Sequence, residues 1–405
     1  MATFYVDSRA AAGGDGSASL PFNTIQAAAA VASGSVVEFV EGSGPYSVVS
    51  STFQPANTSV TWNFNNCWVR GDVDLGASSW LPSATSGYYY LETPGTLVQP
   101  RSVVVDGIWN CESMNLAAAT PSGFENNWRW GNLDALAANT LYVRWHNGED
   151  FRPERISIWA AQQETPIKIV VGKTGHLFND MRVSGSNGAS ASLVYLRHKT
   201  NMRNCLFYNS NWAGIQYAPA TGVECDDMVI AHSQFIACGH KANRISAKVT
   251  NLQLLNNTLS LVHVAVEVDT INNPSVVYKN NIAFNMYAGI LEDNGNPCGF
   301  IEDFNAFHID PSSPHGGKVF AFEGSATWTT TGSNSLPSAT ATSSSNGVDP
   351  LLVSSDDYHL QSTSPAIGAG TDVGLRGYDL AGQPVMRGRK VNIGAYSDYL
   401  GMREN

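Results

Sequence analysis

The feature of this sequence that most constrains its fold is a pair of asparagines that returns after 24 residues. The segment "NNTLSL" begins at Asn256, and "NNIAFN" begins at Asn280. Asparagine is uncommon in strands, and burying its amide is costly unless both ends are hydrogen-bonded. A backbone that returns to the same place after each interval stacks such residues, so that each amide can bond the next. The spacing therefore predicts a repeated coil.

The period extends through the middle of the chain. Related segments occur at spacings of 25, 29, 24, 24 and 22 when they are anchored on Asn179, Asn204, Ser233, Asn257, Asn281 and Asp303. β-rich runs such as "NLQLL" precede the anchors, and runs such as "VAVEV" follow them. One period thus holds about three short strands. It is shorter than a propeller blade, which has ~40–45 residues. This pattern predicts an all-β fold, a single-stranded right-handed parallel β-helix. Its inward stack is expected to contain Ile215, Ile245, Val266 and Ile290.

The predicted organisation is one continuous solenoid. Residues 1–50 form an N-terminal helix and strand cap with the first coil, and the β-helix follows over 51–310, with insertions in 51–165. Loop-rich coils and a closing segment occupy 311–405. Within the cap, "PFNTIQAAAAVAS" predicts a short helix that Asn23 or Thr24 caps.

Composition excludes several classes of protein. Charged residues are 14% of the 405, whereas 43% are hydrophobic, so the chain is not disordered. A net charge of -11 disfavours general nucleic-acid binding and attraction to an anionic membrane. The six cysteines form no CxxC pair, which favours buried free thiols over a zinc site. No apolar stretch is long enough to span a membrane, and the first residues lack the features of a signal peptide.

Both ends of the chain resemble a known family. The opening "YVDS…GGDGS…PFNTIQAA…GSVVEFVEGSGPYSV" and the closing "DPLL…DDYHLQSTSPAIGAG…DLAGQPVMRGRKVNIGAY" are similar to those of right-handed β-helix proteins of the pectate-lyase superfamily. That superfamily includes polysaccharide lyases, glycoside hydrolases, epimerases and phage tailspikes. The resemblance implies the fold and a polysaccharide ligand, and leaves the reaction open.

One subfamily comparison concerns Lys248. Alginate and chondroitin lyases of this fold carry an acidic pair, then a catalytic Lys before an "NNTF"-like step, then an Arg one coil later. Here "ISAKVTNLQLLNNTL" places Lys248 ahead of Asn256, but the next coil, "VHVAVEVDT", has no Arg, and "NRISA" stands where the acidic pair is expected. We therefore do not assign the chain to this subfamily.

Outward positions beside the predicted inward stack supply the candidate catalytic groups. In hydrolysis, two carboxylates act on one glycosidic bond, and their separation decides between inversion and retention. In elimination, a base removes a proton next to a uronate carboxylate while a cation stabilises the developing charge. The carboxylate candidates are Glu267, Asp269 and Glu292. The cationic and basic candidates are His240, Lys241, Arg244 and Lys248.

Aromatic and amide side chains near the same ladder supply candidate substrate contacts, because sugar rings stack on aromatic faces. These are Trp212, Gln216, Tyr217 and Tyr287. Further tryptophans gather earlier in the chain, where they either bind sugar or fill the core of wide coils; the candidates are Trp109, Trp128, Trp130 and Trp145. For the charged groups, the alternative is a solvated surface that keeps the solenoid soluble.

These observations predict an extracellular or virion-associated protein that binds and depolymerises a polysaccharide, as a lyase or a glycoside hydrolase. A phage tailspike-like homotrimer is the first expectation. Its polysaccharide ligand is either acidic or neutral. A non-catalytic glycan-binding or structural virion protein is an alternative, as is a secreted bacterial lyase. We expect no nucleic-acid partner, no membrane insertion and no cofactor. Ca²⁺ is the one alternative kept open, and no motif supports it.

Overall fold

The protein is described here by a computed structural model, in which most of the 405 residues are placed. The description omits residues 76–79, 85–87, 93–99, 106–107, 112–127, 132–139, 145–157, 189, 220–222, 224, 270–273, 287, 294–298, 310–319, 325–326, 329–343, 355–356, 386–390 and 397–405.

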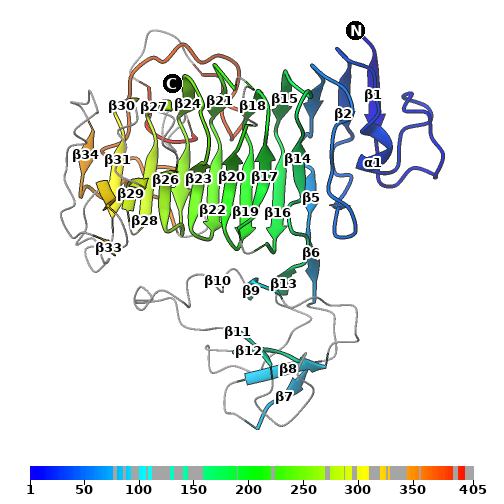
Figure 1. The fold of residues 1–405 in the computed structure, drawn as a ribbon, viewed down its shortest axis with the longest axis horizontal. Helices are drawn as coiled ribbons and strands as arrows, with labels where there is room; N and C mark the ends of the chain where they lie inside the picture. The colour runs from blue at the N-terminus through cyan, green and yellow to red at the C-terminus, as the bar shows by residue number, and fades with distance from the viewer. Residues whose placement is uncertain are drawn as a thin grey trace.

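The fold is the predicted parallel β-helix, in which successive coils stack their strands into three sheets (Figure 1). Sheet A has nine strands: β1 (Thr3–Val6), β2 (Val36–Phe39), β4 (Thr61–Asn63), β15 (His176–Asn179), β18 (Thr200–Arg203), β21 (Val229–Ala231), β24 (Leu252–Leu255), β27 (Ser275–Lys279) and β30 (Gly299–Asp303). Sheet B has nine: β3 (Tyr46–Ser47), β5 (Trp68–Arg70), β16 (Arg182–Ser186), β19 (Leu206–Ser210), β22 (Gln234–Cys238), β25 (Thr258–Ser260), β28 (Ile282–Met286), β31 (Ala306–Ile309) and β34 (Ser345–Asn346).

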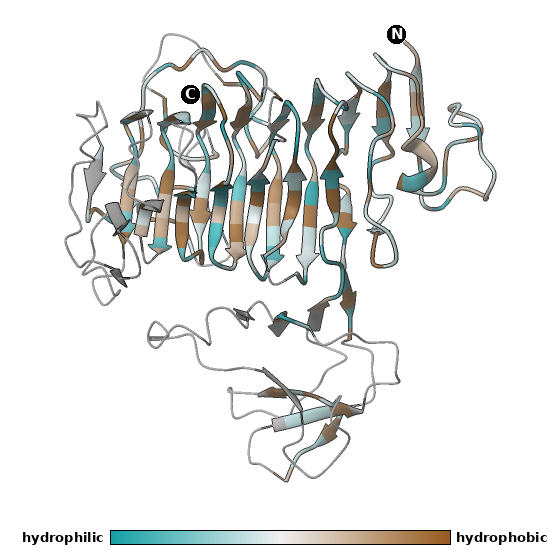
Figure 2. Cartoon of the chain, viewed as in Figure 1, coloured by the Kyte–Doolittle hydropathy of each residue, from teal (hydrophilic) through white to brown (hydrophobic). Residues whose placement is uncertain are grey.

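Sheet C has eight strands, and its last strand, β33, pairs antiparallel with β32. In spatial order they are β14 (Ile167–Ile169), β17 (Ser192–Leu196), β20 (Ala213–Tyr217), β23 (Lys241–Ile245), β26 (Val264–Val268), β29 (Ala288–Asp293), β32 (Phe320–Gly324) and β33 (Thr327–Trp328). Apolar and polar segments alternate along the stacked strands (Figure 2), because successive side chains point into and out of the coil. Inward aromatics also stack between coils, as where Phe207 and Phe235 lie 4.5 Å apart at an interplanar angle of 11°.

The paired asparagines superpose as predicted, at the turn between sheets A and B. Asn280 Nδ2 donates to Asn256 Oδ1 at 3.2 Å, and Asn257 Nδ2 donates to Asn281 Oδ1 at 3.1 Å. The backbone N–H of each inner residue also donates to the side chain one coil on. This inner ladder consists of Cys205, Ser233, Asn257, Asn281 and Asn305, whose bonded neighbours are separated by 28, 24, 24 and 24 residues.

Three predicted anchors therefore need correction. Asn179 and Asp303 are the last residues of their strands in sheet A. Asn204 occupies the outer position of the pair, the residue just before the inner ladder. The outer position has a left-handed backbone in the successive coils from Asp180 to Phe304, with φ of 54° at Asn204, 53° at Asn256 and 56° at Asn280. Asparagine tolerates this conformation better than most residues, which explains its choice there.

The inward stack is also shifted in one coil. Ile215, Val266 and Ile290 share one register position as predicted, but Asn243 occupies that position in β23. Ile245 stacks instead with Tyr217 and Val268. All of these aliphatic side chains are buried in the core. The coil containing β23 accepts a polar inward residue because Asn243 Oδ1 receives the Tyr217 hydroxyl at 3.0 Å.

Between β5 and β14 the chain leaves the solenoid and forms two antiparallel sheets, which lie to one side of the stack (Figure 1). The first contains β10 (Ile108–Cys111), β9 (Ser102–Val105), β13 (Ile158–Ala161) and β6 (Asp72–Asp74). The second contains β11 (Trp128–Gly131), β12 (Thr140–Arg144), β8 (Tyr88–Glu92) and β7 (Leu81–Pro82). Their buried residues, such as Val103 and Leu141, form a cluster separate from the solenoid core. The side chains of Trp109, Trp128 and Trp130, and residue Trp145, lie outside the described residues.

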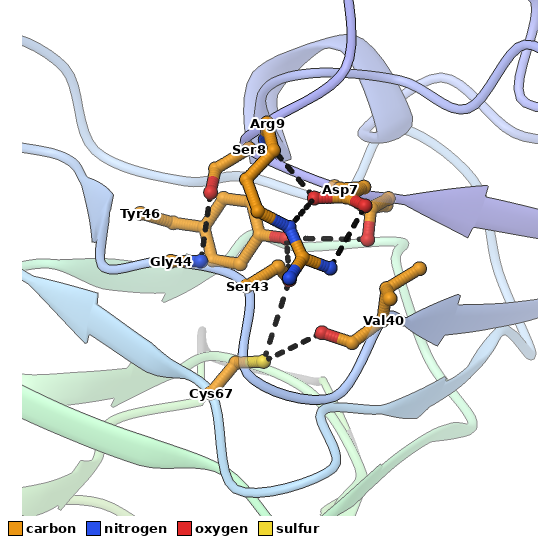
Figure 3. Close-up of polar contacts among 9 residues, drawn as sticks. Asp7, Ser8, Arg9, Val40, Ser43, Gly44, Tyr46 and Cys67 are labelled. Carbon is orange, nitrogen blue, oxygen red and sulfur yellow. Dashed lines mark hydrogen bonds and ion pairs between the residues drawn. The ribbon is translucent and has the colours of Figure 1, made fainter.

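The N-terminal helix is shorter than predicted: α1 spans only Ile25–Ala28 and is capped by Thr24, whose side chain accepts from Ala27 N. The chain turns after Ala28 because it must reach β2, and Gly34 allows the turn with a φ of 76°. Nearby, the Tyr46 hydroxyl bonds Ser43 Oγ at 2.5 Å and Val6 O at 3.2 Å, and Cys67 Sγ lies 3.5 Å from Val40 O (Figure 3). These contacts link β1 to β3 (Tyr46–Ser47), and the residue after β2 to the residue before β5, at the capped end.

The four cysteines whose side chains are described are free and buried, as predicted: Cys67, Cys205, Cys225 and Cys238. Burial raises the pKa of the Cys67 thiol, and it raises the pKa of Cys205 and of Cys225 to about 12. Thiols with such values stay protonated and unreactive near neutral pH.

The C-terminal segment returns along the stack and covers the turn between sheets A and B (Figure 1). Asn280 exchanges two hydrogen bonds with the Thr371 backbone, at 2.7 and 3.0 Å, and Asn256 Nδ2 donates to Asn392 O at 3.1 Å. A Cβ on Gly370 would lie 2.9 Å from Asn280 Oδ1, so only glycine allows this approach. The outer asparagines thus bond both to one another and to the closing segment.

Candidate functional site

The candidate site lies on the outer face of sheet C, where four neighbouring coils place different residues at one register position. Gln216, Arg244, Glu267 and Leu291 are in register on β20, β23, β26 and β29. Each lies next to an inward residue of the core, so all four point outward, as the sequence predicts for them. Equivalent positions in neighbouring parallel strands lie about 4.8 Å apart, which brings these unlike side chains into contact.

The charged side chains of this face form one network. Lys241 Nζ lies 2.7 Å from Glu267 Oε2, and Arg244 Nε lies 3.3 Å from Glu267 Oε1. Arg244 Nη2 then reaches Asp269 Oδ2 at 2.5 Å. We call Lys241, Arg244, Glu267 and Asp269 the charged cluster. It contains two cations and two anions, which balance in charge.

The cluster is buried on one side and open on the other. The exposed fractions of the side chains are 7% for Lys241 and 6% for Glu267, against 18% for Arg244 and 25% for Asp269. Burying a charged pair costs desolvation, which close pairing offsets only in part. A charged pair at this depth on a solenoid is therefore not explained by solubility alone.

Burial acts on the ionisation of the inner pair. It raises the pKa of the Glu267 carboxyl, against the opposing attraction of Lys241 and Arg244. It lowers the pKa of the Lys241 amine, against the attraction of Glu267. Both shifts favour the uncharged forms, so the energy difference between the ion pair and its neutral form is reduced. Groups with such shifts are typical of functional sites, although structural pairs can show them as well.

Aromatic rings border the cluster at the turn between sheets B and C. Trp212, His240 and His263 each precede the first residue of their strand in sheet C, so they occupy equivalent positions in three coils. The rings of Trp212 and His240 stack with centroids 4.4 Å apart, and His240 meets His263 edge-on at 5.2 Å. Lys241 Nζ lies 4.1 Å from the Trp212 ring centroid, within the range of a cation–π contact.

Gln216 and Ser246 extend the polar face toward the N-terminal coil. Gln216 Nε2 donates to Ser246 Oγ at 3.1 Å. Gln216 is 8% exposed, and its Oε1 has no hydrogen-bond partner among the described residues. A buried amide oxygen without a partner is uncommon in native structures and marks a place where a hydroxyl or water can donate.

The structure brings together seven of the residues proposed from sequence: Trp212, Gln216, His240, Lys241, Arg244, Glu267 and Asp269. Lys241, which the sequence placed in a turn, is the first residue of β23. Lys248 is exposed in the turn after β23 and takes no part in these contacts.

Tyr217 does not lie on the outer face. It was predicted to contact substrate, but its side chain points into the coil, is fully buried and donates to Asn243. Burial raises the pKa of its hydroxyl well above the ordinary value. It cannot reach a ligand on the outer face, because the two-residue alternation places it opposite Gln216. Tyr287 and the side chain of Glu292 lie outside the described residues; the backbone of Glu292 is in register with Val268.

Sequence reasoning missed His263. The signal was present, since His263 precedes Val264 as His240 precedes Lys241, and aligning the coils on sheet C would have found it. The sequence also did not reveal that Arg244 bridges Glu267 and Asp269, the two carboxylates proposed for hydrolysis. In the part of the chain that the structure describes, no three His, Cys, Asp or Glu side chains are arranged to hold a metal ion.

Comparison with known proteins supports the fold. No protein-family model matches the chain, and no curated protein does. Among solved structures, one titled "Glycoside hydrolase" has a TM-score of 0.50 and 9% identity, with 87% of this chain and 98% of that chain covered. Pectate lyase Pel9A gives 0.43 and 12%, with 98% and 96% covered, and XylC with xylose gives 0.46 and 11%, with 79% and 68% covered. At these identities, the likeness to the glycoside hydrolase shows the fold alone. Among the described residues, no helix is long and apolar enough to cross a membrane.

Proposed function

We propose that the protein binds a polysaccharide on the outer face of sheet C and depolymerises it. The observation that carries this proposal is the inner pair of the charged cluster, a nearly buried Lys241 amine held 2.7 Å from Glu267 beside Arg244. Trp212 and His240 supply rings at the border of the same face. A solved structure of this fold is titled "Glycoside hydrolase", which supports testing polysaccharide cleavage first.

The geometry favours elimination over hydrolysis. A hydrolase needs one carboxylic acid to protonate the leaving oxygen and one free carboxylate to activate water or attack. Here Arg244 contacts both Glu267 and Asp269, so neither carboxylate is free to act alone. Elimination instead needs a base and a cation, and the cluster has both.

In this mechanism Arg244 neutralises the carboxylate of a uronate, which makes the proton on the adjacent carbon more acidic. The neutral Lys241 amine takes that proton, and the lowered pKa of Lys241 increases the fraction in this form. A carbon–carbon double bond forms as the bond to the glycosidic oxygen breaks. The leaving oxygen takes its proton from water. Glu267 positions the Lys241 amine and the Arg244 guanidinium.

The test is product analysis on a panel of acidic and neutral polysaccharides. Ultraviolet absorbance reports the unsaturated product of elimination, and reducing ends without that absorbance report hydrolysis. Lys241→Met and Arg244→Lys are expected to abolish product, and Lys248→Ala, which removes a cation outside the cluster, is expected to keep full activity. Thermal unfolding of each variant separates loss of chemistry from loss of fold. Full turnover in both cluster variants would reject the mechanism.

A second candidate is a non-catalytic glycan-binding protein on the same scaffold. The observation that favours it is that the charges of the cluster already balance, with Lys241 and Glu267 almost inaccessible. This candidate predicts saturable binding of a polysaccharide and no product of either kind.

We also propose that the protein acts outside the cell or on a virion, as a homotrimer. Its support is the resemblance of both chain ends to right-handed β-helix proteins of the pectate-lyase superfamily, which includes phage tailspikes, and the extracellular location of most polysaccharides. Light scattering tests the assembly, since a trimer has three times the chain mass of 43.4 kDa. A mass equal to a single chain at all concentrations would reject the trimer.

A further inference from the structure

The charged cluster has an inner and an outer half that differ in what they can do. The inner pair, Lys241 and Glu267, is nearly buried, whereas Arg244 and Asp269 of the outer contact are partly exposed, at 18% and 25%. Solvent and salt screen a partly exposed pair more than a buried one, so that it contributes less to stability. The outer contact can therefore be exchanged, and the inner pair cannot be broken without leaving a buried charge.

The charge of the cluster depends on which carboxylate occupies the outer contact. With Asp269 in place, two cations face two anions, and an approaching anion meets no net attraction. When the carboxylate of Asp269 moves away, Lys241, Arg244 and Glu267 carry one net positive charge. The Nη2 edge of Arg244 is then open, and a guanidinium binds a planar carboxylate in a forked geometry.

The surroundings of this contact also suit a sugar. Ser246 follows Ile245, the register partner of Val268, as Asp269 follows Val268, so Ser246 and Asp269 occupy neighbouring outward positions. Gln216 bonds Ser246 and keeps its buried Oε1 without a partner among the described residues. A sugar hydroxyl beside a carboxylate can donate to that oxygen. The unpartnered Gln216 oxygen is a second observation, independent of the charges, that supports a ligand beside Arg244.

We propose that Asp269 is a built-in substitute for the substrate: its carboxylate occupies the place on Arg244 that the carboxylate of an anionic sugar takes. Asp269 thereby sets specificity. A neutral glycan cannot displace it, and a uronate can, because only a uronate replaces the lost ion pair. This inference rests on the proposed function, and it assigns to Asp269 a role in selecting the ligand, not in the chemical step.

The test is the affinity of the full-length protein for a uronic-acid oligosaccharide and for its methyl ester, measured by isothermal titration calorimetry. Asp269→Asn removes the competing charge and keeps the shape of the side chain. We expect it to bind the acid about fivefold more tightly than the wild type does, the factor that corresponds to an exposed ion pair. Binding of the ester is expected to stay unchanged.

Asp15→Asn is the matched control, since Asp15 is an exposed aspartate of the N-terminal cap and its loss changes the net charge equally. We expect it to bind like the wild type. Asp269→Ser repeats the test with a shorter side chain, and thermal unfolding confirms that each variant is folded. Unchanged or weaker binding of the acid by both Asp269 variants, or an equal gain by Asp15→Asn, would overturn the proposal.

Glycan binding by the wild type distinguishes a failure of this inference from a failure of the proposed function. If the wild type binds no glycan, acidic or neutral, the proposed function fails. The full chain and Asp269→Asn are then titrated with sodium glucuronate by isothermal titration calorimetry. Saturable binding that is tighter in the variant supports the substitute role. No binding to either protein rejects it.

Discussion

The turn between sheets A and B and the outer face of sheet C belong to the same coils but differ in their residues. At the turn, one residue type repeats: Asn257, Asn281 and Asn305 bond in series, and the C-terminal segment covers the outer asparagines. On sheet C, the register position occupied by Arg244 holds four different residues in four coils. A position that needs the same backbone in every coil favours few residue types, with asparagine the most frequent here, whereas a position free of that need can vary and carry chemistry.

The backbone explains the first half of this comparison. The outer turn residue is left-handed in successive coils, with φ of 48° at His232 and 54° at Phe304 as well as at the asparagines. The inner residue must satisfy backbone groups of two coils, as Asn281 does by donating to Leu254 O while accepting from Asn257. No such requirement acts on an outward residue in the middle of a strand. The predictions below test this division.

The largest expected effect is the loss of an inner ladder amide. Asn281→Ala removes the bonds to Asn257, Leu254 and Asn305 and leaves buried backbone groups unpaired. We expect a loss of about 4 kcal/mol in the free energy of unfolding, measured by denaturant titration. The control is Asn201→Ala, which removes one bond at a half-buried outward position and should cost about 1 kcal/mol. Equal losses in the two variants would contradict a special role for the turn.

The inner pair of the charged cluster should show the next largest effect. Glu267→Gln leaves the nearly buried Lys241 amine without its anion, and breaking such a pair costs about 3 kcal/mol. The double variant Lys241→Met with Glu267→Leu removes both charges and is expected to recover most of that stability in the same denaturant titration. Recovery of stability with complete loss of turnover would show that the pair is kept for chemistry. Recovery of both stability and turnover would show that the Lys241–Glu267 pair has no role in the reaction.

A pH dependence should arise from His232, which interrupts the outer asparagines. Burial lowers the pKa of His232 from 6.5 to about 4, and neither ring nitrogen meets hydrogen-bond geometry with a described residue. The unfolded chain binds the proton more readily, so the stabilising contribution is complete above pH 6.5 and is lost as the pH falls toward about 4. By about pH 5 the loss should reach about 2 kcal/mol.

His232→Asn tests this assignment and the ladder together. Asparagine suits the left-handed backbone and removes the titrating group, so the variant should be more stable and less sensitive to acid. Buried His176, whose pKa burial also lowers to about 4, remains in the variant and keeps part of the dependence. Unfolding measured by tryptophan fluorescence across the acid range provides the comparison. If the variant loses as much stability in acid as the wild type, His232 is not the source of the pH dependence.

The smallest expected effect concerns Trp212, at the border of the charged cluster. Trp212→Ala removes the ring that meets Lys241 and His240, and a lost sugar–aromatic contact is worth about 1 kcal/mol, or roughly a fivefold loss of glycan affinity. Tyr378→Ala removes an exposed aromatic from the C-terminal segment and should leave affinity unchanged. An equal loss in both variants would point to nonspecific binding.

The sequence by itself determined the repeating part of this protein. The 24-residue return of the asparagine pair predicted the coil, and the pairs bond as expected because a fixed backbone requirement recurs in every turn. The outward direction of Arg244, Glu267 and Asp269 also followed from two-residue alternation alone. The spacing was less reliable where coils differ in length, so the anchors at Asn179, Asn204 and Asp303 were displaced.

Only the tertiary structure decided which outward residues meet. The register of β23 against its neighbours places Asn243 rather than Ile245 beside Ile215, and the stacking of the coils brings His263 to the aromatic border. The bridge from Arg244 to two carboxylates spans two coils and depends on side-chain directions that spacing does not fix. Local periodicity specifies the backbone of a solenoid, whereas contacts between coils depend on the length of every turn between them.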